Sequence, residues 1–288
     1  MRTFLATSFL VALLAAGCGS ANEREYKLQG QILSVAPDHL SAQIKHEEIA
    51  GFMAAMTMTY KVRDGKEFEP LKPGDLITST LIVADTDAYL KAVRKVGEAP
   101  LERTAAEPAP GAASGFELVK QGAPVPDFAL VNQDGEHVSL ATYRGQALVV
   151  TFTYTSCPMP TFCPLMDRNF AALQAKLKEQ NNHLRAHLLS VTIDPAVDTP
   201  AVLKAHGDKL GLDPRLWSFL TGERDDIDKW AAGFGVSVSR ATNDPTDITH
   251  NLRTVIIDRQ GNLVQTFTGN EWTPDQVLGD VQVMVGVD

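Results

Sequence analysis

The chain of 288 residues is poor in cysteine and in positive charge, and it has only one long apolar run. Its 26 Lys and Arg residues stand against 35 Asp and Glu residues, which gives a formal net charge of −9. Because there is also no basic run, nucleic acid is not an expected partner. The apolar run from Phe4 to Ala16 is too short for a lasting membrane helix, and no second span of membrane length follows it.

The N-terminal segment has the pattern of an export signal. Arg2 precedes the apolar run, which ends in Leu14-Ala15-Ala16-Gly17-Cys18 and resembles the lipobox of bacterial lipoproteins. The resemblance implies that residues 1–17 are a signal peptide, that the thiol of Cys18 is lipidated, and that residues 18–25 tether a periplasmic protein to a bacterial membrane. Ordinary secretion with a free Cys18 is the alternative.

With Cys18 assigned to lipid, one cysteine pair remains, Cys157 and Cys163. This usage fits an oxidising compartment, in which an unaided pair tends to oxidise. A working dithiol would therefore need a thiol reductant as a partner. A structural disulfide that closes a short loop is the alternative.

Two domains are expected from the length and the patterning. Residues 26–97 hold short alternating segments separated by turn signals, which predicts a small antiparallel β-barrel of the OB type. Residues 98–115 are rich in Ala, Pro, Glu and Gly, which predicts a semi-extended linker. Residues 116–288 alternate strands and helices, which predicts an α/β domain of the thioredoxin-like class.

The second domain is expected to begin with a hairpin around Asp134-Gly135 and to end with a helix after Thr273-Pro274. Between them the pattern predicts strands at 148–154, 186–193, 254–257 and 263–268, a short apolar run at 217–220, and helices at 164–180, from Thr199-Pro200 and at 225–234.

The stretch from Leu148 to Phe170 concentrates the chemistry of the chain. A buried strand is followed by Cys157-Pro158, by Cys163-Pro164 and then by a helical pattern. Proline suits the first turn of a helix, so we expect Cys163 at or just before the helix N-terminus and Cys157 on the loop that leads to it. A helix N-terminus stabilises a thiolate, which is both a nucleophile and a ligand for soft metals.

Two thiolates alone leave zinc or iron short of ligands, whereas Cu(I) accepts two or three. A third soft ligand would complete the site, and His250 is a candidate because it opens an apolar strand in ITHNLRTVIIDRQG. In a thioredoxin-type sheet the start of such a strand lies near the Cys loop. A lone histidine before a strand is more often an ordinary loop residue, so both interpretations stay open.

Residues 116–288 resemble the Sco/SenC family of copper proteins. The resemblance rests on the two Cys-Pro pairs with their following helix, on Ser190 to Pro195 followed by Asp198-Thr199-Pro200, and on Thr249-His250 before a strand. It implies a thioredoxin fold in which Cys157, Cys163 and His250 bind copper for delivery to the copper-site subunit of cytochrome c oxidase.

The cysteine spacing departs from that family. Five residues separate Cys157 from Cys163, where the family usually has three, and Pro160 stiffens the longer loop. The loop is either a variant with the same role or one shifted towards thiol–disulfide exchange. Met159 is an extra candidate thioether ligand, although a methionine in a loop more often packs.

The first domain carries a second group of soft side chains. Met53, Met56 and Met58, three of the seven methionines, follow His46 within a short stretch. Met56 and Met58 alternate, so on a strand they point to the same face. Thioethers with an imidazole suit Cu(I) and stay competent in an oxidising compartment, while a methionine-lined core is the alternative.

This stretch is similar to CusF-like periplasmic copper-binding domains, small barrels that hold Cu(I) with one His and two Met beneath an aromatic cap. The resemblance implies that His46, Met56 and Met58 are the ligands. The capping tryptophan is absent, Met53 occupies about its place and Phe52 is adjacent, so Met53 is included as a candidate ligand.

Two copper patterns on one chain predict a membrane-tethered periplasmic copper chaperone that binds Cu(I) or Cu(II) and supplies cytochrome c oxidase or another apo-cuproprotein. The linker would raise the effective concentration of one site near the other. The rival hypothesis is an enzyme, a thiol–disulfide oxidoreductase that reduces the acceptor and needs the redox dithiol Cys157 and Cys163 but not His250. A copper-resistance buffer, for which the second domain would be dispensable, is a further alternative.

Overall fold

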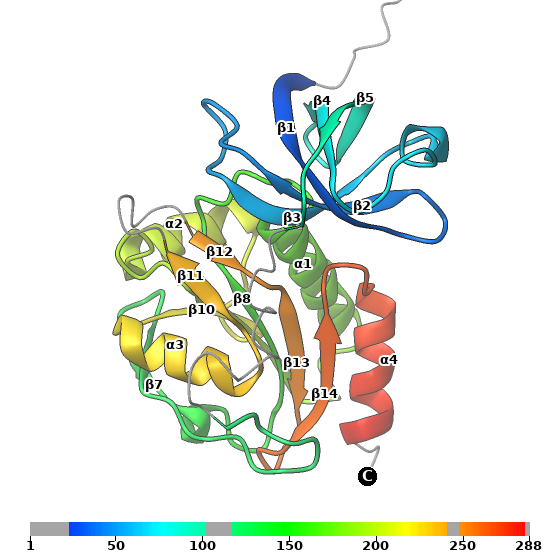
Figure 1. The fold of residues 1–288 in the computed structure, drawn as a ribbon. Helices are drawn as coiled ribbons and strands as arrows, with labels where there is room; N and C mark the ends of the chain where they lie inside the picture. Colours follow the sequence, from blue (N-terminus) through cyan, green and yellow to red (C-terminus); the bar gives the residue numbers. More distant parts are fainter. Residues whose placement is uncertain (1–22, 102–116, 241–247, 286–288) are drawn as a thin grey trace, which may run out of the picture.

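The computed structural model describes residues 23–101, 117–240 and 248–285, and the structural statements below concern these ranges. Two β-sheet units follow one another along the chain and pack against each other (Figure 1). The expected signal peptide, Cys18 and most of the expected linker lie outside the described residues.

The first unit is a five-stranded antiparallel sheet in the order β3-β2-β1-β4-β5. Its strands are β1 (Arg24–Val35), β2 (Ser41–His46), β3 (Met56–Lys61), β4 (Asp75–Val83) and β5 (Ala88–Glu98). β1 begins inside the segment expected to be a tether, because Arg24 pairs with Val83 of β4. An isolated bridge joins Val62 to Leu90, but β3 and β5 form no ladder. The sheet is therefore barrel-like, as predicted, without being closed.

One face of this sheet forms the core of the first unit. Buried and exposed residues alternate along β2 and β3, as in an antiparallel sheet with one solvated face. Leu28, Ile32 and Ile44 have no exposed surface in that core. Gly30 lets β1 approach β2 closely, because a Cβ there would lie 2.7 Å from the carbonyl oxygen of Lys45.

The second unit is a seven-stranded sheet in the order β14-β13-β8-β9-β10-β6-β7. Its strands are β6 (Leu130–Asn132), β7 (His137–Val138), β8 (Ala147–Thr153), β9 (Ala186–Thr192), β10 (Trp217–Thr221), β13 (Arg253–Ile257) and β14 (Leu263–Thr268). β8, β9 and β10 are parallel and buried at every residue, which is typical of central strands covered on both faces. A separate two-stranded ribbon, β11 (Val238–Arg240) with β12 (Ile248–His250), was not expected.

Helices cover both faces of the second sheet, as the thioredoxin-like class requires. They are α1 (Cys163–Glu179), α2 (Pro200–Leu210), α3 (Arg224–Gly233) and α4 (Pro274–Val285). α1 and α4 lie side by side, where Phe170 of α1 joins the core on one face (Figure 1). Trp230 of α3 packs in the core on the other face with Phe152.

The predicted starts of α1 and α2 are confirmed. Thr199 caps α2 by accepting a hydrogen bond from the Val202 amide, and Pro164 occupies the first turn of α1. Within the described ranges, none of the helices combines the length and the apolarity that crossing a membrane requires.

Candidate metal sites

The first cluster of soft side chains lies on the paired strands β2 and β3. Their register sets His46 opposite Met56 and Ile44 opposite Met58. His46 and Met58 are buried and Met56 is partly buried, whereas Thr57 between the methionines is exposed. The strand pairing thus brings His46, Met56 and Met58 to one face of the sheet, as the alternation in the sequence predicts.

His46 has the protonation state of a metal ligand. Its Nδ1 lies 2.7 Å from the carbonyl oxygen of Glu47, which can only accept, so Nδ1 carries the proton and Nε2 keeps its lone pair. Nε2 is buried and has no hydrogen-bond partner among the described residues. Desolvation lowers the pKa of His46, which favours the neutral ring. A buried, unpartnered nitrogen beside two thioethers fits a soft ion such as Cu(I).

Aromatic side chains surround this cluster, although none is a tryptophan. The ring of Tyr60 meets that of His46 edge-on at 5.6 Å between centroids. The Tyr60 hydroxyl lies 3.8 Å from the sulfur of Met53, and Tyr26 stacks on Phe52 at 4.3 Å. Met53 therefore reaches the cluster from the loop between β2 and β3 through its contact with Tyr60.

The second cluster joins the Cys loop, the first turn of α1 and the ribbon strand β12. α1 begins at Cys163, which is buried, and Cys157 is partly buried on the preceding loop. The sulfur of Cys163 lies 4.0 Å from Nε2 of His250. Bonds of about 2.3 Å to sulfur and about 2.0 Å to nitrogen, as in zinc sites, would separate two donors by roughly 3.7 Å at a trigonal angle and roughly 4.3 Å in a line. The spacing therefore suits one ion shared by Cys163 and His250.

The two cysteines are free thiols of unequal acidity. A hydrogen bond with Cys163 lowers the pKa of Cys157 to about 7, whereas burial raises the pKa of Cys163 well above its ordinary value. Cys157 therefore ionises first. Among the described residues no three His, Cys, Asp or Glu side chains already stand together as a metal site, so the side chains of Cys157, Cys163 and His250 would have to come closer together to share a single ion.

The position of His250 differs from the prediction. His250 ends β12 instead of opening the strand β13, which begins at Arg253. It pairs with Val238 in the ribbon, outside the main sheet. The Nδ1 of His250 lies 3.1 Å from the carbonyl oxygen of Asn251, which leaves the lone pair on Nε2 towards Cys163, and desolvation lowers the pKa of His250 to about 4. The ribbon thus presents a neutral imidazole to the Cys loop.

Asp198 fixes the chain where β8 ends and the Cys loop begins. Its fully buried carboxylate accepts hydrogen bonds from the Thr155 amide at 3.1 Å, from the Thr192 hydroxyl at 2.6 Å and from the Thr155 hydroxyl. The sequence analysis used Asp198 only as part of a motif. Its positioning role could not be seen in the sequence, because Thr155 lies 43 residues earlier in the chain.

A small cavity lies between the two clusters. Its volume is about 60 Å³, and the two units line it together. The first unit contributes Met53, Met56, Thr57 and Met58, and the second contributes Tyr154, Cys157, Pro158, Met159, Phe162, Ile248, Thr249 and His250. The Thr249 hydroxyl lies 3.9 Å from the sulfur of Met56. Most of the predicted ligands of both domains therefore meet at one interface, although His46 and Cys163 do not line the cavity itself.

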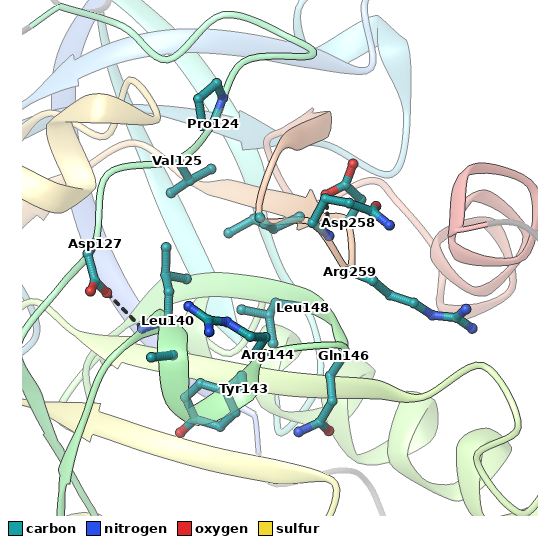
Figure 2. Close-up of a pocket in the computed structure, with 14 residues that line it drawn as sticks. Pro124, Val125, Asp127, Leu140, Tyr143, Arg144, Gln146, Leu148, Asp258 and Arg259 are labelled. Atoms are coloured by element: carbon teal, nitrogen blue, oxygen red, sulfur yellow. Dashed lines mark hydrogen bonds between the residues drawn. The ribbon is translucent and has the colours of Figure 1, made fainter.

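A cavity of about 240 Å³ lies at the other end of the second unit (Figure 2). It is bordered by Leu148 near the start of β8 and by the turn after β13 with Asp258, whereas the Cys loop follows the end of β8. Asp127 and Arg144 face it as well, but its lining includes no Cys, Met or His. This second cavity is therefore not a candidate for a soft metal.

Comparison with known proteins connects both units to copper proteins. Residues 118–286 match the family model SCO1/SenC, and residues 25–95 match the model for the copper binding periplasmic protein CusF. The SCO1 protein homolog of Bacillus subtilis is 30% identical over 160 residues, which are 55% of this chain and 81% of that protein.

Solved structures agree with these matches. A SCO1/SenC family lipoprotein from Bacillus anthracis is 28% identical with a TM-score of 0.51, and the match covers 57% of this chain and 95% of that one. BsSco, described as a member of the Sco family of cytochrome c oxidase assembly proteins, is 28% identical with a TM-score of 0.50 over the same shares. Both resemblances inferred from the sequence and the thioredoxin-like fold are thereby confirmed.

Proposed function

The chain belongs to the SCO1/SenC family, and we propose that it is a copper chaperone whose second domain holds Cu(I) or Cu(II) with Cys157, Cys163 and His250. The observation that carries the proposal is the 4.0 Å distance from the Cys163 sulfur to Nε2 of His250, with the free thiol of Cys157 on the adjoining loop. Thiolate and imidazole ligands suit copper. The acceptor proposed is the copper-site subunit of cytochrome c oxidase, because BsSco belongs to a family of cytochrome c oxidase assembly proteins.

The Cys loop supplies the chemistry of release. The hydrogen bond with Cys163 lowers the pKa of Cys157, so its thiolate is the less basic of the two sulfur ligands and the more readily displaced from copper. The buried Cys163 and the fixed His250 hold the ion while Cys157 exchanges. An acceptor with further thiolate or imidazole ligands would then take the copper by stepwise ligand exchange.

The first domain, residues 26–97, takes up Cu(I) in this proposal. Its ligands are His46, Met56 and Met58, with Met53 beside them. The buried Nε2 of His46, which has no partner within the described ranges, supports this role, as does the match to the CusF model. Because thioethers do not form disulfides, this site keeps its ligands in an oxidising compartment.

We place the protein in the periplasm on a lipid anchor. Residues 1–17 would be removed, Cys18 would carry the lipid, and residues 98–115 would link the domains. The CusF model is described as periplasmic and the related Bacillus anthracis protein as a lipoprotein, which supports this placement. Mass spectrometry of the mature protein tests it, since a Cys18→Ala variant should lose both the lipid mass and membrane association.

The chaperone function is tested with the full-length mature chain, reduced and free of oxygen. Wild type should hold two Cu(I) per chain and pass copper to an apo-fragment of the oxidase copper-site subunit. His250→Ala should weaken the second site and slow the transfer, whereas His183→Ala, at an exposed histidine, should change neither. Transfer that is indifferent to His250 would contradict the proposal.

A thiol–disulfide oxidoreductase is the second candidate, and the depressed pKa of Cys157 favours it. Such an enzyme would reduce a disulfide of the same apo-fragment with electrons from a thiol reductant. A variant of His250 distinguishes the two functions. Disulfide reduction should persist in His250→Ala and vanish in Cys157→Ser, whereas copper delivery should suffer in both.

A further inference from the structure

The five-residue Cys loop inserts a methionine of the second domain into the first. Met159 is 4% exposed and belongs to the buried cluster that contains Met58 and Ile49 of the first domain. Cys157 and Phe162 of the same loop pack against that cluster. A thioether from the second domain therefore lies among the side chains of the first copper site.

Hydrogen bonds hold the Cys loop in this position. The guanidinium of Arg168 donates to the Pro160 carbonyl oxygen at 2.8 Å, and the Asn270 side-chain amide donates to the Thr161 carbonyl oxygen at 2.7 Å. The Phe162 amide donates to the Met159 carbonyl oxygen at 3.0 Å, which closes a turn at the methionine. The backbone of the loop is thus fixed from the Met159 carbonyl to Phe162.

The cavity at this interface is rich in soft donors. Four thioethers, from Met53, Met56, Met58 and Met159, line it together with the thiol of Cys157 and the ring of His250. Its volume is about 60 Å³, which is enough for a bare Cu(I) ion.

We propose that this cavity is a passage for Cu(I) from the first site to the second, and that Met159 holds the ion while it crosses. The inference rests on the proposed function of the two sites. The methionines of the first site lie on one side of the passage, and Cys157 and His250 lie on the other. Met159 belongs to the second domain but is buried with Met58, and it lines the cavity together with residues of both ligand sets.

The transfer is ligand exchange without a change of oxidation state. Copper exchanges its ligands one at a time, so that it keeps two or three throughout. A bond to the Met159 sulfur forms as one bond to a ligand of the first site breaks, and the remaining bonds to that site and to Met159 break in turn as copper binds the sulfurs of Cys157 and Cys163 and Nε2 of His250. Copper stays Cu(I), and each thiol that is protonated releases its proton to water. Because thiolates are stronger ligands for Cu(I) than thioethers, the exchange runs towards the second site.

The test uses the reduced full-length chain and one equivalent of Cu(I), and it follows the thiolate–copper absorption as the second site fills. Met159→Leu removes the sulfur at nearly constant volume and should slow this filling by about tenfold. The final stoichiometry and the affinity of each site should stay unchanged. Met166→Leu is the matched control, since Met166 is buried in the second domain outside the cavity, and it should fill at the wild-type rate.

The proposal also requires that copper passes through the first site before it reaches the second. His46→Leu should slow filling of the second site in wild type, and it should add nothing further to Met159→Leu. Met159→Ile, a second apolar replacement, should reproduce the slowing, and thermal unfolding checks that each variant is folded.

Filling at the wild-type rate in Met159→Leu would overturn the passage. If Met159→Leu lowers the filling rate of the second site and the Cu(I) affinity of the first site by the same factor, the proposed passage is also wrong, because Met159 would then be a resident ligand. Binding of no Cu(I) by the wild-type chain would instead refute the proposed function itself.

Discussion

The two candidate copper sites face each other across one interface, yet they are built from different parts. The first lies on a strand ladder, where the register alone sets His46 opposite Met56. The second depends on a loop, a helix start and a ribbon, which bring Cys157, Cys163 and His250 together. The ligands of the first site therefore already share one face of a ladder, whereas the three ligands of the second are not yet gathered into one metal site among the described residues.

The two sites also differ in the chemistry of their sulfur ligands. Thioethers neither ionise nor form disulfides, so the first site responds little to protons and is not lost to disulfide formation. The thiols of the second site do both, and Cys157 has a pKa of about 7. In the proposed function, capture and release are therefore divided between the domains, with control of release in the second. Each prediction below tests one side of this division.

The largest effect should come from removing a thiolate. Changing an outer-shell partner of a metal ligand costs about 10- to 100-fold in affinity. Loss of the ligand itself in Cys157→Ser should cost the second site at least about 1,000-fold, and the first site should keep its Cu(I). Competition with a Cu(I) chelator in the full-length chain measures both sites. Ser156→Ala, at the exposed neighbouring residue, is the control and should leave two tight copper ions.

The next effect is a difference in pH dependence. Copper displaces the thiol protons of the second site. Because the pKa of Cys163 is raised, the affinity should fall as the pH drops, by about tenfold per pH unit above pH 7 and by about 100-fold per unit below about pH 7, where Cys157 is protonated too. The first site should stay flat over that range, because thioethers carry no proton and the pKa of His46 is lowered below its ordinary value of 6.5. Chelator competition at several pH values measures this, and parallel slopes would contradict the division.

A smaller effect is expected from one thioether. Met58→Leu keeps the volume of a buried side chain, so it should cost less than about 1.5 kcal/mol of unfolding free energy. It should nevertheless weaken Cu(I) binding at the first site by about 30-fold, or ~2 kcal/mol, and leave the second site unchanged. Met166→Leu controls for the loss of a buried thioether elsewhere. Equal affinities in the two variants would favour a methionine-lined core without metal.

Local patterns in the sequence predicted much of this molecule. Alternation predicted the shared face of Met56 and Met58, and the Cys-Pro and Thr-Pro pairs predicted the starts of α1 and α2. The ribbon that carries His250 was missed. β11 has only three residues, Val-Ser-Arg, and none of them is buried, so no hydrophobic period marks it.

The interface between the domains could not be predicted from these patterns. A methionine in a loop was expected to pack, but the partners of Met159 lie about 100 residues earlier, in a different sheet. No periodicity connects a loop to a distant core, because such contacts depend on how two finished domains dock. The signal available was the length of the Cys loop, which suggested a changed function but not where Met159 would lie.

The smallest effect on copper should come from Asp198, which touches neither sulfur nor imidazole. In Asp198→Asn the buried acceptor loses its charge and one oxygen becomes an amide donor, so the hydrogen bonds from Thr155 and Thr192 are weakened. We expect a loss of about 2 kcal/mol in unfolding free energy. Because Thr155 leads into the Cys loop, the second site should also weaken by about threefold, while the first site keeps its affinity. Denaturant unfolding and chelator competition measure the two effects, and Thr199→Ser, which retains the cap of α2, is the neighbouring control. An unchanged second site in a destabilised Asp198→Asn chain would show that the loop holds its ligands without this anchor.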